Sequence, residues 1–203
     1  MYVALDCEMV GVGQDGFTSS LARVTLVGWN GETILDQYIR QSRPVTDYRT
    51  FVSGITQDDL EGDQAVDMAA CREAVLNALK DKVLVGHGLK SDLSALGIRH
   101  PWYMTRDTAK YEPFMKVRFD DGILWPRKLR DLTHEKLGRD IQAAGVPHSP
   151  YEDALAALDL YKAVRNKWEK VMAYKVGKTK EIEAAKAATA AAQQTATNAA
   201  AAE

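Results

Sequence analysis

Two carboxylates stand two residues apart near the start of the chain, in the segment DCEMVG at residues 6–11. An apolar run at residues 2–5 precedes them and predicts a buried β-strand. Residues i and i+2 of a strand point to the same face, so Asp6 and Glu8 should stand side by side. Like charges that close repel each other. Either a cation lies between them, or one acid is protonated, or the face is open to water.

A third acid, Asp92, follows a short apolar strand predicted at residues 83–85. It falls in the first turn of a helix that we expect to begin at Ser91. A carboxylate there is also favoured by the helix dipole, which is a sufficient structural reason for its presence. Asp92 therefore becomes a candidate ligand only in combination with other acids.

A fourth acid, Asp153, lies in the first turn of a helix with a well-marked start. Ser149 and Glu152 have the spacing of a capping box, and Pro150 occupies the first helical position. Glu152 thus has a structural role, whereas Asp153 has none beyond the dipole. His148 lies on the loop just before the cap, where a lone histidine is most often a surface residue.

These side chains are far apart in the sequence but share one kind of position, at strand ends and helix starts. In α/β sheets such positions gather in one crevice. Four carboxylates there would hold Mg²⁺ or Mn²⁺, and two such ions about 4 Å apart form a site for phosphoryl transfer. The neighbouring histidine could then act as a general base. The Cys and His spacing typical of zinc sites is absent from the sequence.

The strands and helices that must position these residues predict an α/β fold with a mixed sheet flanked by helices. We expect three antiparallel strands first, at residues 2–9, 21–27 and 33–39, with a hairpin turn at Asn30-Gly31. Alternating helices and strands follow. The predicted domains are a catalytic domain, residues 1–174, and an Ala-rich, low-complexity tail, residues 175–203. We expect the last helix to end near Tyr174 and the tail beyond residue 184 to be disordered or a frayed helix.

Composition sets broad limits on function. The formal net charge is −2, so there is no global basic signature of nucleic-acid binding. Residues 1–67 are acidic and residues 99–139 are basic, which suits a cation site beside an anionic ligand but also fits an ordinary solvated surface. Two cysteines make no disulfide framework, and neither a secretory signal nor an apolar span is visible, so we expect an intracellular protein.

The combination of DCEMVG, VGHGLKSDL and HSPYEDA resembles the DEDDh family of 3′→5′ exonucleases, which has a ribonuclease H-like fold. More narrowly, it is similar to the eukaryotic branch that includes RNA exonuclease 4 and the interferon-stimulated exonuclease. The resemblance covers about residues 2 to 170 in the right order. Further matching segments lie at residues 21–23, 46–50, 53–56, 106–108 and 137–138.

The resemblance implies a role for each of the residues above. Asp6, Glu8 and Asp153 would bind metal directly, and Asp92 would act mostly through water. His148 would be the general base. For substrate binding, Met9 would lie against the terminal nucleoside and Arg49 would touch the terminal nucleotide. The expected cofactors are two Mg²⁺ or Mn²⁺ ions with no organic cofactor, and the expected compartment is the nucleus or nucleolus.

We therefore expect a metal-dependent 3′→5′ exonuclease that acts on single-stranded RNA and releases nucleoside 5′-monophosphates, without a membrane partner. The alternatives are a DNA-directed exonuclease and an inactive nucleic-acid-binding module on the same fold. Basic and aromatic side chains of residues 110–130 are candidates for following the strand, although a surface loop with core aromatics explains them as well. They are Lys110, Lys116, Arg118, Arg127, Lys128 and Arg130, with Tyr111, Phe114, Phe119 and Trp125.

Overall fold

The computed structural model describes residues 1–117 and 122–200, with side chains as far as residue 190. Its central sheet has the order β3-β2-β1-β5-β6, with β4 pairing the far end of β1. Strands β1, β2 and β3 are antiparallel, whereas β5 and β6 run parallel to β1. The expected mixed sheet is therefore confirmed. The strands are β1 (Tyr2–Val12), β2 (Thr18–Gly28), β3 (Thr33–Tyr38), β4 (Val45–Asp47), β5 (Val83–Gly86) and β6 (Thr105–Asp107).

Local turns and caps define where strands and helices begin and end. Gly31, at φ 87°, closes the β2–β3 hairpin, and its N–H donates to the carbonyl of Gly28 at 3.0 Å. Thr56 forms a capping box with Asp59 at the start of α2. The helices are α1 (Thr50–Ser53), α2 (Gln57–Glu61), α3 (Met68–Leu79), α4 (Lys90–Leu96), α5 (Leu129–Leu137) and α6 (Pro150–Ala200), with a small hairpin of β7 (Lys116–Val117) and β8 (Leu124–Trp125).

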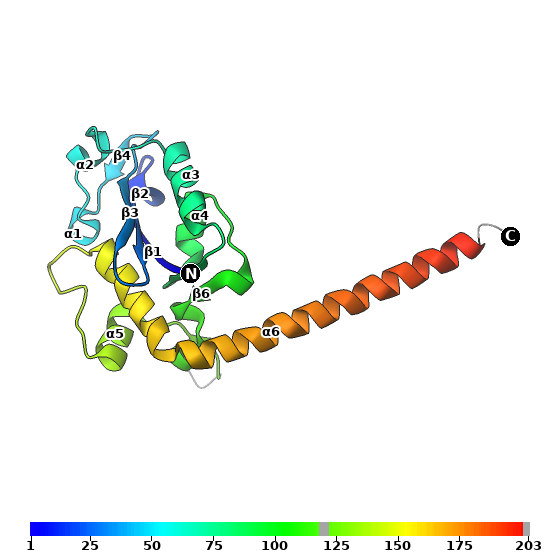
Figure 1. The fold of residues 1–203 in the computed structure, drawn as a ribbon. Helices are drawn as coiled ribbons and strands as arrows, with labels where there is room; N and C mark the ends of the chain where they lie inside the picture. Colours follow the sequence, from blue (N-terminus) through cyan, green and yellow to red (C-terminus); the bar gives the residue numbers. More distant parts are fainter. Residues whose placement is uncertain (118–121, 201–203) are drawn as a thin grey trace. The chain divides into compact units, whose positions relative to one another are not determined.

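One face of the sheet is covered by α3 and α4, as Figure 1 shows. Their apolar side chains and those of the strands form one buried cluster. The other face receives the first part of α6, where the rings of Tyr161 and Tyr2 lie 5.3 Å apart and the Tyr151 hydroxyl donates to the carbonyl of Gly31. The buried cluster includes Val3, Leu5, Val24, Leu26, Cys71, Val75, Leu84, Leu89 and Leu96.

The chain divides into two compact units, Met1–Ala163 and Val164–Glu203. All candidate site residues lie in the first unit. The second unit is the C-terminal part of α6, which continues to Ala200 without a break near Tyr174, where the sequence predicted that the helix would end. Alanine has the highest helix propensity, which explains why the helix continues into the low-complexity segment. Among the described residues, no helix is both long and apolar enough to cross a bilayer.

Candidate active site

Asp6 and Glu8 lie on β1, the central strand of the sheet. In the β1–β2 ladder, Asp6 lies opposite Thr25 and Glu8 lies opposite Arg23. The register shifts between Glu8 and Met9, so a bulge interrupts the regular pairing next to the second acid. Glu8 keeps only 7% of its surface exposed. Both carboxylates are thus fixed by a largely buried central strand rather than by a surface loop.

Asp92 is held in place by the turn that leads from β5 into α4. The side chain of Asp107, at the end of β6, accepts a hydrogen bond from the N–H of Gly88 at 2.7 Å. His87 lies between the hydroxyl of Thr108, at 2.9 Å, and the carbonyl of Arg127, at 3.0 Å. These contacts tie the β5–α4 turn to the neighbouring parallel strand. Asp92 therefore enters the first turn of α4 with 7% of its surface exposed, from a fixed position.

Asp153 reaches the site from the first turn of α6. The N–H of Glu152 donates to the hydroxyl of Ser149 at 3.4 Å, which is the capping contact expected from the sequence. Asp153 is 4% exposed and its Oδ2 accepts a hydrogen bond from Nε2 of Gln142 at 2.9 Å. Its other oxygen, Oδ1, is buried without a hydrogen-bond partner among the described residues. A buried carboxylate oxygen without a partner is costly, and this one suits the role of a metal ligand.

The four acids share one electrostatic environment. The pKa of Asp6 is raised well above its ordinary value, first by burial and then by the charges of Asp153, Asp92 and Glu8. Burial, followed by the charge of Asp153, raises the pKa of Glu8 to about 8. Burial also raises the pKa of Asp92 to about 7 and that of Asp153 above its ordinary value. The structure therefore brings the four predicted acids together with too little positive charge to compensate them.

The residues fit a hard divalent cation by two criteria. The donors are carboxylate oxygens, which Mg²⁺ and Mn²⁺ prefer, and Oδ1 of Asp153 lacks a partner among the described residues. Among the residues that the structure describes, however, no group of three Asp, Glu, His or Cys side chains is already arranged to enclose an ion. Without an ion, the negative charges of the four acids repel each other, which explains why their side chains do not converge on one point. The donor set fits a cation, and the identity and number of ions remain predictions.

His148 lies next to this group on the loop that precedes α6. Its N–H donates to the carbonyl of Val52 at 2.7 Å, so helix α1 fixes the backbone of this loop. The ring nitrogen Nδ1 lies 3.7 Å from Oδ2 of Asp153, and about a third of the side chain, 34%, is exposed. This orientation favours the tautomer with the proton on Nδ1, facing the carboxylate. The other nitrogen, Nε2, is then a proton acceptor.

The sequence profile of the exonuclease family RNase_T matches residues 3–161. The chain belongs to this exonuclease family. It is 43% identical over 171 residues to RNA exonuclease 4 of Mycosarcoma maydis, covering 84% of this chain and 44% of that protein. It is 42% identical over 167 residues to human RNA exonuclease 4, covering 82% of this chain and 38% of that protein. The chain thus spans less than half of the length of these two relatives.

Solved structures with a similar fold include catalytic modules that contain a nuclease domain. The Neurospora crassa Pan2 catalytic unit has a TM-score of 0.70 and 26% sequence identity, over 86% of this chain and 28% of that one. The Saccharomyces cerevisiae Pan2 exonuclease module in complex with A7 RNA has a TM-score of 0.69 and 29% identity, over 86% of this chain and 30% of that one. The ribonuclease-like fold predicted from the sequence is therefore confirmed.

Arg23 lies beside the candidate site, although the sequence pattern gave it no role. Its Nε and Nη2 donate to the two carboxylate oxygens of Asp36, at 2.8 and 2.7 Å, and its guanidinium lies 4.9 Å from the ring centre of Tyr38. Burial and the charge of Asp153 have the largest effects on the pKa of Glu8, and both raise it. The charge of Arg23 has the next largest effect and lowers this pKa. The position of Arg23 beside Glu8 could have been inferred from the register of the β1–β2 hairpin, which pairs residue 23 with residue 8.

Cys7 supports the site from its position on strand β1 between the first two acids. Its pKa is raised, first by burial and then by the charges of Asp92 and Asp6, so the thiol stays protonated. The thiol donates a hydrogen bond to Asp92, and that bond lowers the pKa of the carboxyl. Cys7 is thus a hydrogen-bond donor to the site rather than a nucleophile.

The two predicted substrate contacts have structural partners within the chain. Met9 is partly buried and packs against the main core cluster. Arg49, at φ 51°, donates from Nη1 to the hydroxyl of Ser19 at 2.9 Å and from Nη2 to the carbonyl of Gly16 at 3.0 Å. Its guanidinium therefore fastens α1 to the β1–β2 turn. Contacts of Met9 and Arg49 with a nucleotide remain predictions.

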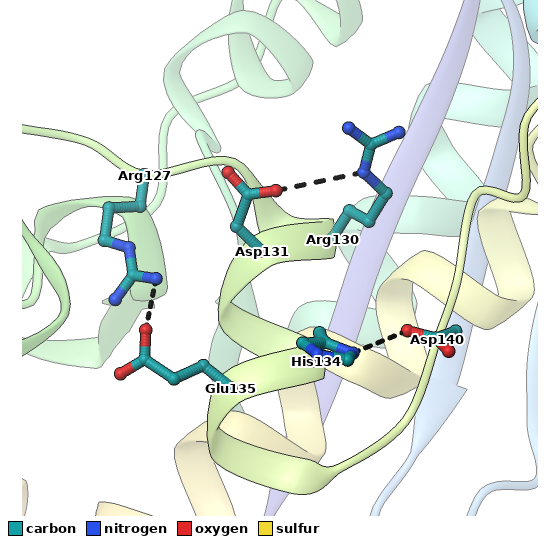
Figure 2. Close-up of a pocket in the computed structure, with 6 residues that line it drawn as sticks. All are labelled: Arg127, Arg130, Asp131, His134, Glu135 and Asp140. Atoms are coloured by element: carbon teal, nitrogen blue, oxygen red, sulfur yellow. Dashed lines mark hydrogen bonds and ion pairs between the residues drawn. The ribbon is translucent and has the colours of Figure 1, made fainter.

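The basic region at residues 110–130 is less available for an RNA strand than its composition indicated. A pocket of about 610 Å³ on α5 is lined by Arg127, Arg130, Asp131, His134, Glu135 and Asp140. Figure 2 shows that basic side chains of this pocket face acidic ones. Arg127 forms an ion pair with Glu135, and His134 contacts Asp140 at 2.7 Å. Three acids against two arginines do not favour a polyanion in this pocket.

The remaining side chains of this region divide between core and surface. Phe114 is buried, 4% exposed, with its ring 5.0 Å from that of Tyr111, so it is a core residue rather than a stacking platform. Trp125 is 41% exposed on β8 and stays a candidate for stacking. Arg118 and Phe119 lie outside the described residues. Lys110, Lys116 and Lys128 are exposed.

Proposed function

We propose that this domain is a metal-dependent 3′→5′ exonuclease that hydrolyses single-stranded RNA to nucleoside 5′-monophosphates. The observation that carries the proposal is a group of four acids with raised pKa values, three of them buried and Asp6 partly buried, beside a histidine whose Nε2 can accept a proton. One oxygen of this group, Oδ1 of Asp153, is buried without a hydrogen-bond partner among the described residues. This group has the donors and the general base that phosphodiester hydrolysis requires.

The choice of RNA rests on the relatives. Two of them are named RNA exonuclease 4, and the similar Pan2 module was solved in complex with A7 RNA. The polarity and the product rest on the resemblance of the five site residues to the DEDDh pattern. Together these observations favour RNA cleavage from the 3′ end over a DNA-directed enzyme.

Each residue of the site has a task in this proposal. Divalent ions would offset the charge of the scissile phosphate and promote ionisation of the attacking water. Asp6, Glu8 and Asp153 would hold the ions, and Asp92 would act mostly through water. Nε2 of His148 accepts a proton from the attacking water while Nδ1–H faces Asp153, which stabilises the imidazolium as it forms.

The terminal bases need a surface beside the acids, and helix α1 offers one. The Val52 carbonyl accepts the N–H of His148, so this helix adjoins the loop that carries the general base. Phe51, the preceding residue, is 80% exposed, and Val146 on the histidine loop is 57% exposed. Exposed apolar side chains next to a site suit stacking against unpaired bases. This supports a single-stranded rather than a double-stranded substrate.

The product and the substrate class are tested together by chromatography. The protein is incubated with single-stranded RNA or DNA of the same sequence in Mn²⁺, and the released mononucleotides are identified. The proposal predicts nucleoside 5′-monophosphates, formed faster from RNA, and none with Asp153→Asn. Nucleoside 3′-monophosphates, or internal fragments without mononucleotides, would contradict it.

A further inference from the structure

Gln142 lies on the loop between α5 and α6 and reaches back to the proposed metal site. Its side-chain nitrogen Nε2 donates to Oδ2 of Asp153 at 2.9 Å. Its backbone has φ 54°, in the left-handed region that residues with a Cβ rarely adopt. The described part of the chain has only two other such residues besides glycine, Arg49 and Asp81. A strained backbone whose side chain ends on a candidate ligand calls for a functional explanation.

The hydrogen bond divides the two oxygens of Asp153 between different tasks. Oδ2 accepts from Gln142 and faces Nδ1 of His148 at 3.7 Å. Oδ1 is buried and has no hydrogen-bond partner among the described residues. A carboxylate held at one oxygen cannot rotate freely, so its other oxygen keeps a fixed direction. Hydrogen bonds of this kind orient metal ligands in many proteins.

The loop is anchored by the residues just before Gln142, which restricts where its amide can lie. Ile141, the preceding residue, is 3% exposed and belongs to the core. Nη1 of Arg139 donates to Oδ2 of Asp159 on α6 at 3.0 Å. These contacts fix the loop to the helix that carries Asp153. They also hold the unfavourable backbone angle of Gln142, which a free loop would relax.

We infer that Gln142 is a positioning residue, which holds Asp153 at Oδ2 so that Oδ1 is presented to the divalent cation. This inference deepens the proposed function and rests on it. A purely structural Gln142, which only closes the loop, would leave metal binding unchanged once the protein is folded. Metal affinity therefore separates the two roles.

The test compares Gln142→Leu and Gln142→Gly with the unaltered protein. Leucine keeps much of the side-chain volume but cannot donate a hydrogen bond. Glycine also removes the donor, yet it adopts φ 54° without strain, so its fold should be preserved. Asp81→Gly is the matched control, because Asp81 has φ 57° on an exposed turn away from the candidate ligands. Mn²⁺ affinity is measured by isothermal titration calorimetry, and melting temperature is measured in EDTA.

Both Gln142 variants should bind Mn²⁺ about 10- to 100-fold more weakly, which is the usual effect of losing a hydrogen bond to a metal ligand. In saturating Mn²⁺, kcat for RNA cleavage should fall while KM stays close to that of the unaltered protein. Asp81→Gly should match the unaltered protein in both. Unchanged Mn²⁺ affinity in either folded Gln142 variant would overturn the inference.

The unaltered protein tests the underlying function in the same experiment. If it binds Mn²⁺ and cleaves RNA but the Gln142 variants do so equally well, only the positioning role is wrong. If it neither binds Mn²⁺ nor cleaves RNA, the proposed function itself is wrong and the inference falls with it.

Discussion

Arg23 lies directly across the β1–β2 ladder from Glu8, and two hydrogen bonds to Asp36 hold its guanidinium there. The site thus contains one fixed positive charge beside the acid whose pKa is raised to about 8. The charge of Arg23 favours the ionised form of Glu8, which is the form that binds a cation. In the proposed function a divalent cation and a proton would compete for this carboxylate, and Arg23 extends the pH range over which the carboxylate is ionised.

Replacing Arg23 by glutamine should therefore raise the pKa of Glu8 further. At any pH below the pKa, the ionised fraction falls about tenfold for each pH unit by which the pKa rises. We expect the acidic limb of the pH–rate profile for RNA cleavage to move to higher pH, with a loss of activity near neutral pH that recovers in part in alkaline buffer. Arg23→Lys keeps the charge but not the paired hydrogen bonds, so it should move the limb less. Identical profiles for all three proteins would contradict this role.

Removing one acid should separate catalysis from folding. We expect Asp6→Asn and Asp153→Asn each to reduce RNA cleavage by on the order of 10²–10³-fold or more, because charge stabilisation at the phosphate is lost. Both variants should fold, since asparagine is isosteric and removes a repulsive charge. Circular dichroism and a labelled-RNA assay measure the two properties. A folded variant with undiminished activity would refute the ligand assignment.

The histidine should behave differently from the acids. His148→Ala should slow cleavage by about 10²–10⁴-fold, the usual contribution of a general base, while Mn²⁺ affinity stays close to that of the unaltered protein. Single-turnover cleavage and calorimetry measure these quantities. Loss of Mn²⁺ binding in this variant would instead make His148 a metal ligand.

The raised pKa values also predict how the metal-free protein responds to pH. Glu8 and Asp92 have ordinary pKa values of 4.5 and 3.8, and the fold raises them to about 8 and about 7. Their contribution to stability is therefore complete below their ordinary pKa values and is lost as pH rises through 7 and 8. In EDTA, the melting temperature should fall between about pH 5 and pH 8.

Glu8→Gln is the matched control for this pH dependence. It removes one ionisable group, so its melting temperature should fall less over the same range. Saturating Mn²⁺ should also flatten the curve in the unaltered protein, because ligand binding stabilises the folded state. A melting temperature that rises steadily over this range in EDTA would show that the acids are not buried together.

Much of the site could be predicted from the sequence because its elements depend on local rules. Asp6 and Glu8 follow from strand periodicity, and Asp153 follows from a helix start marked by Ser149. These patterns operate over a few residues, so their geometry can be read along the chain. Bringing the acids into one crevice needed only the general topology of α/β sheets.

Other contacts could not be predicted because they depend on tertiary structure. The bond from Gln142 to Asp153 requires a left-handed backbone in a loop with no turn signature. The hydrogen bonds from the guanidinium of Arg49 to Gly16 and Ser19 also join parts of the chain that no local pattern connects. The charge of Arg127 is likewise balanced by Glu135 on α5. Composition indicates charges but not their partners.

The central claim is tested most directly by a time course on end-labelled single-stranded RNA, in Mn²⁺, in Mg²⁺ and in EDTA. With the label at the 5′ end, we expect a ladder of products that shorten one nucleotide at a time and disappear in EDTA. With the label at the 3′ end, we expect immediate release of a labelled mononucleotide. A mononucleotide released first from the 5′ label, or cleavage that persists in EDTA, would contradict a metal-dependent 3′→5′ exonuclease.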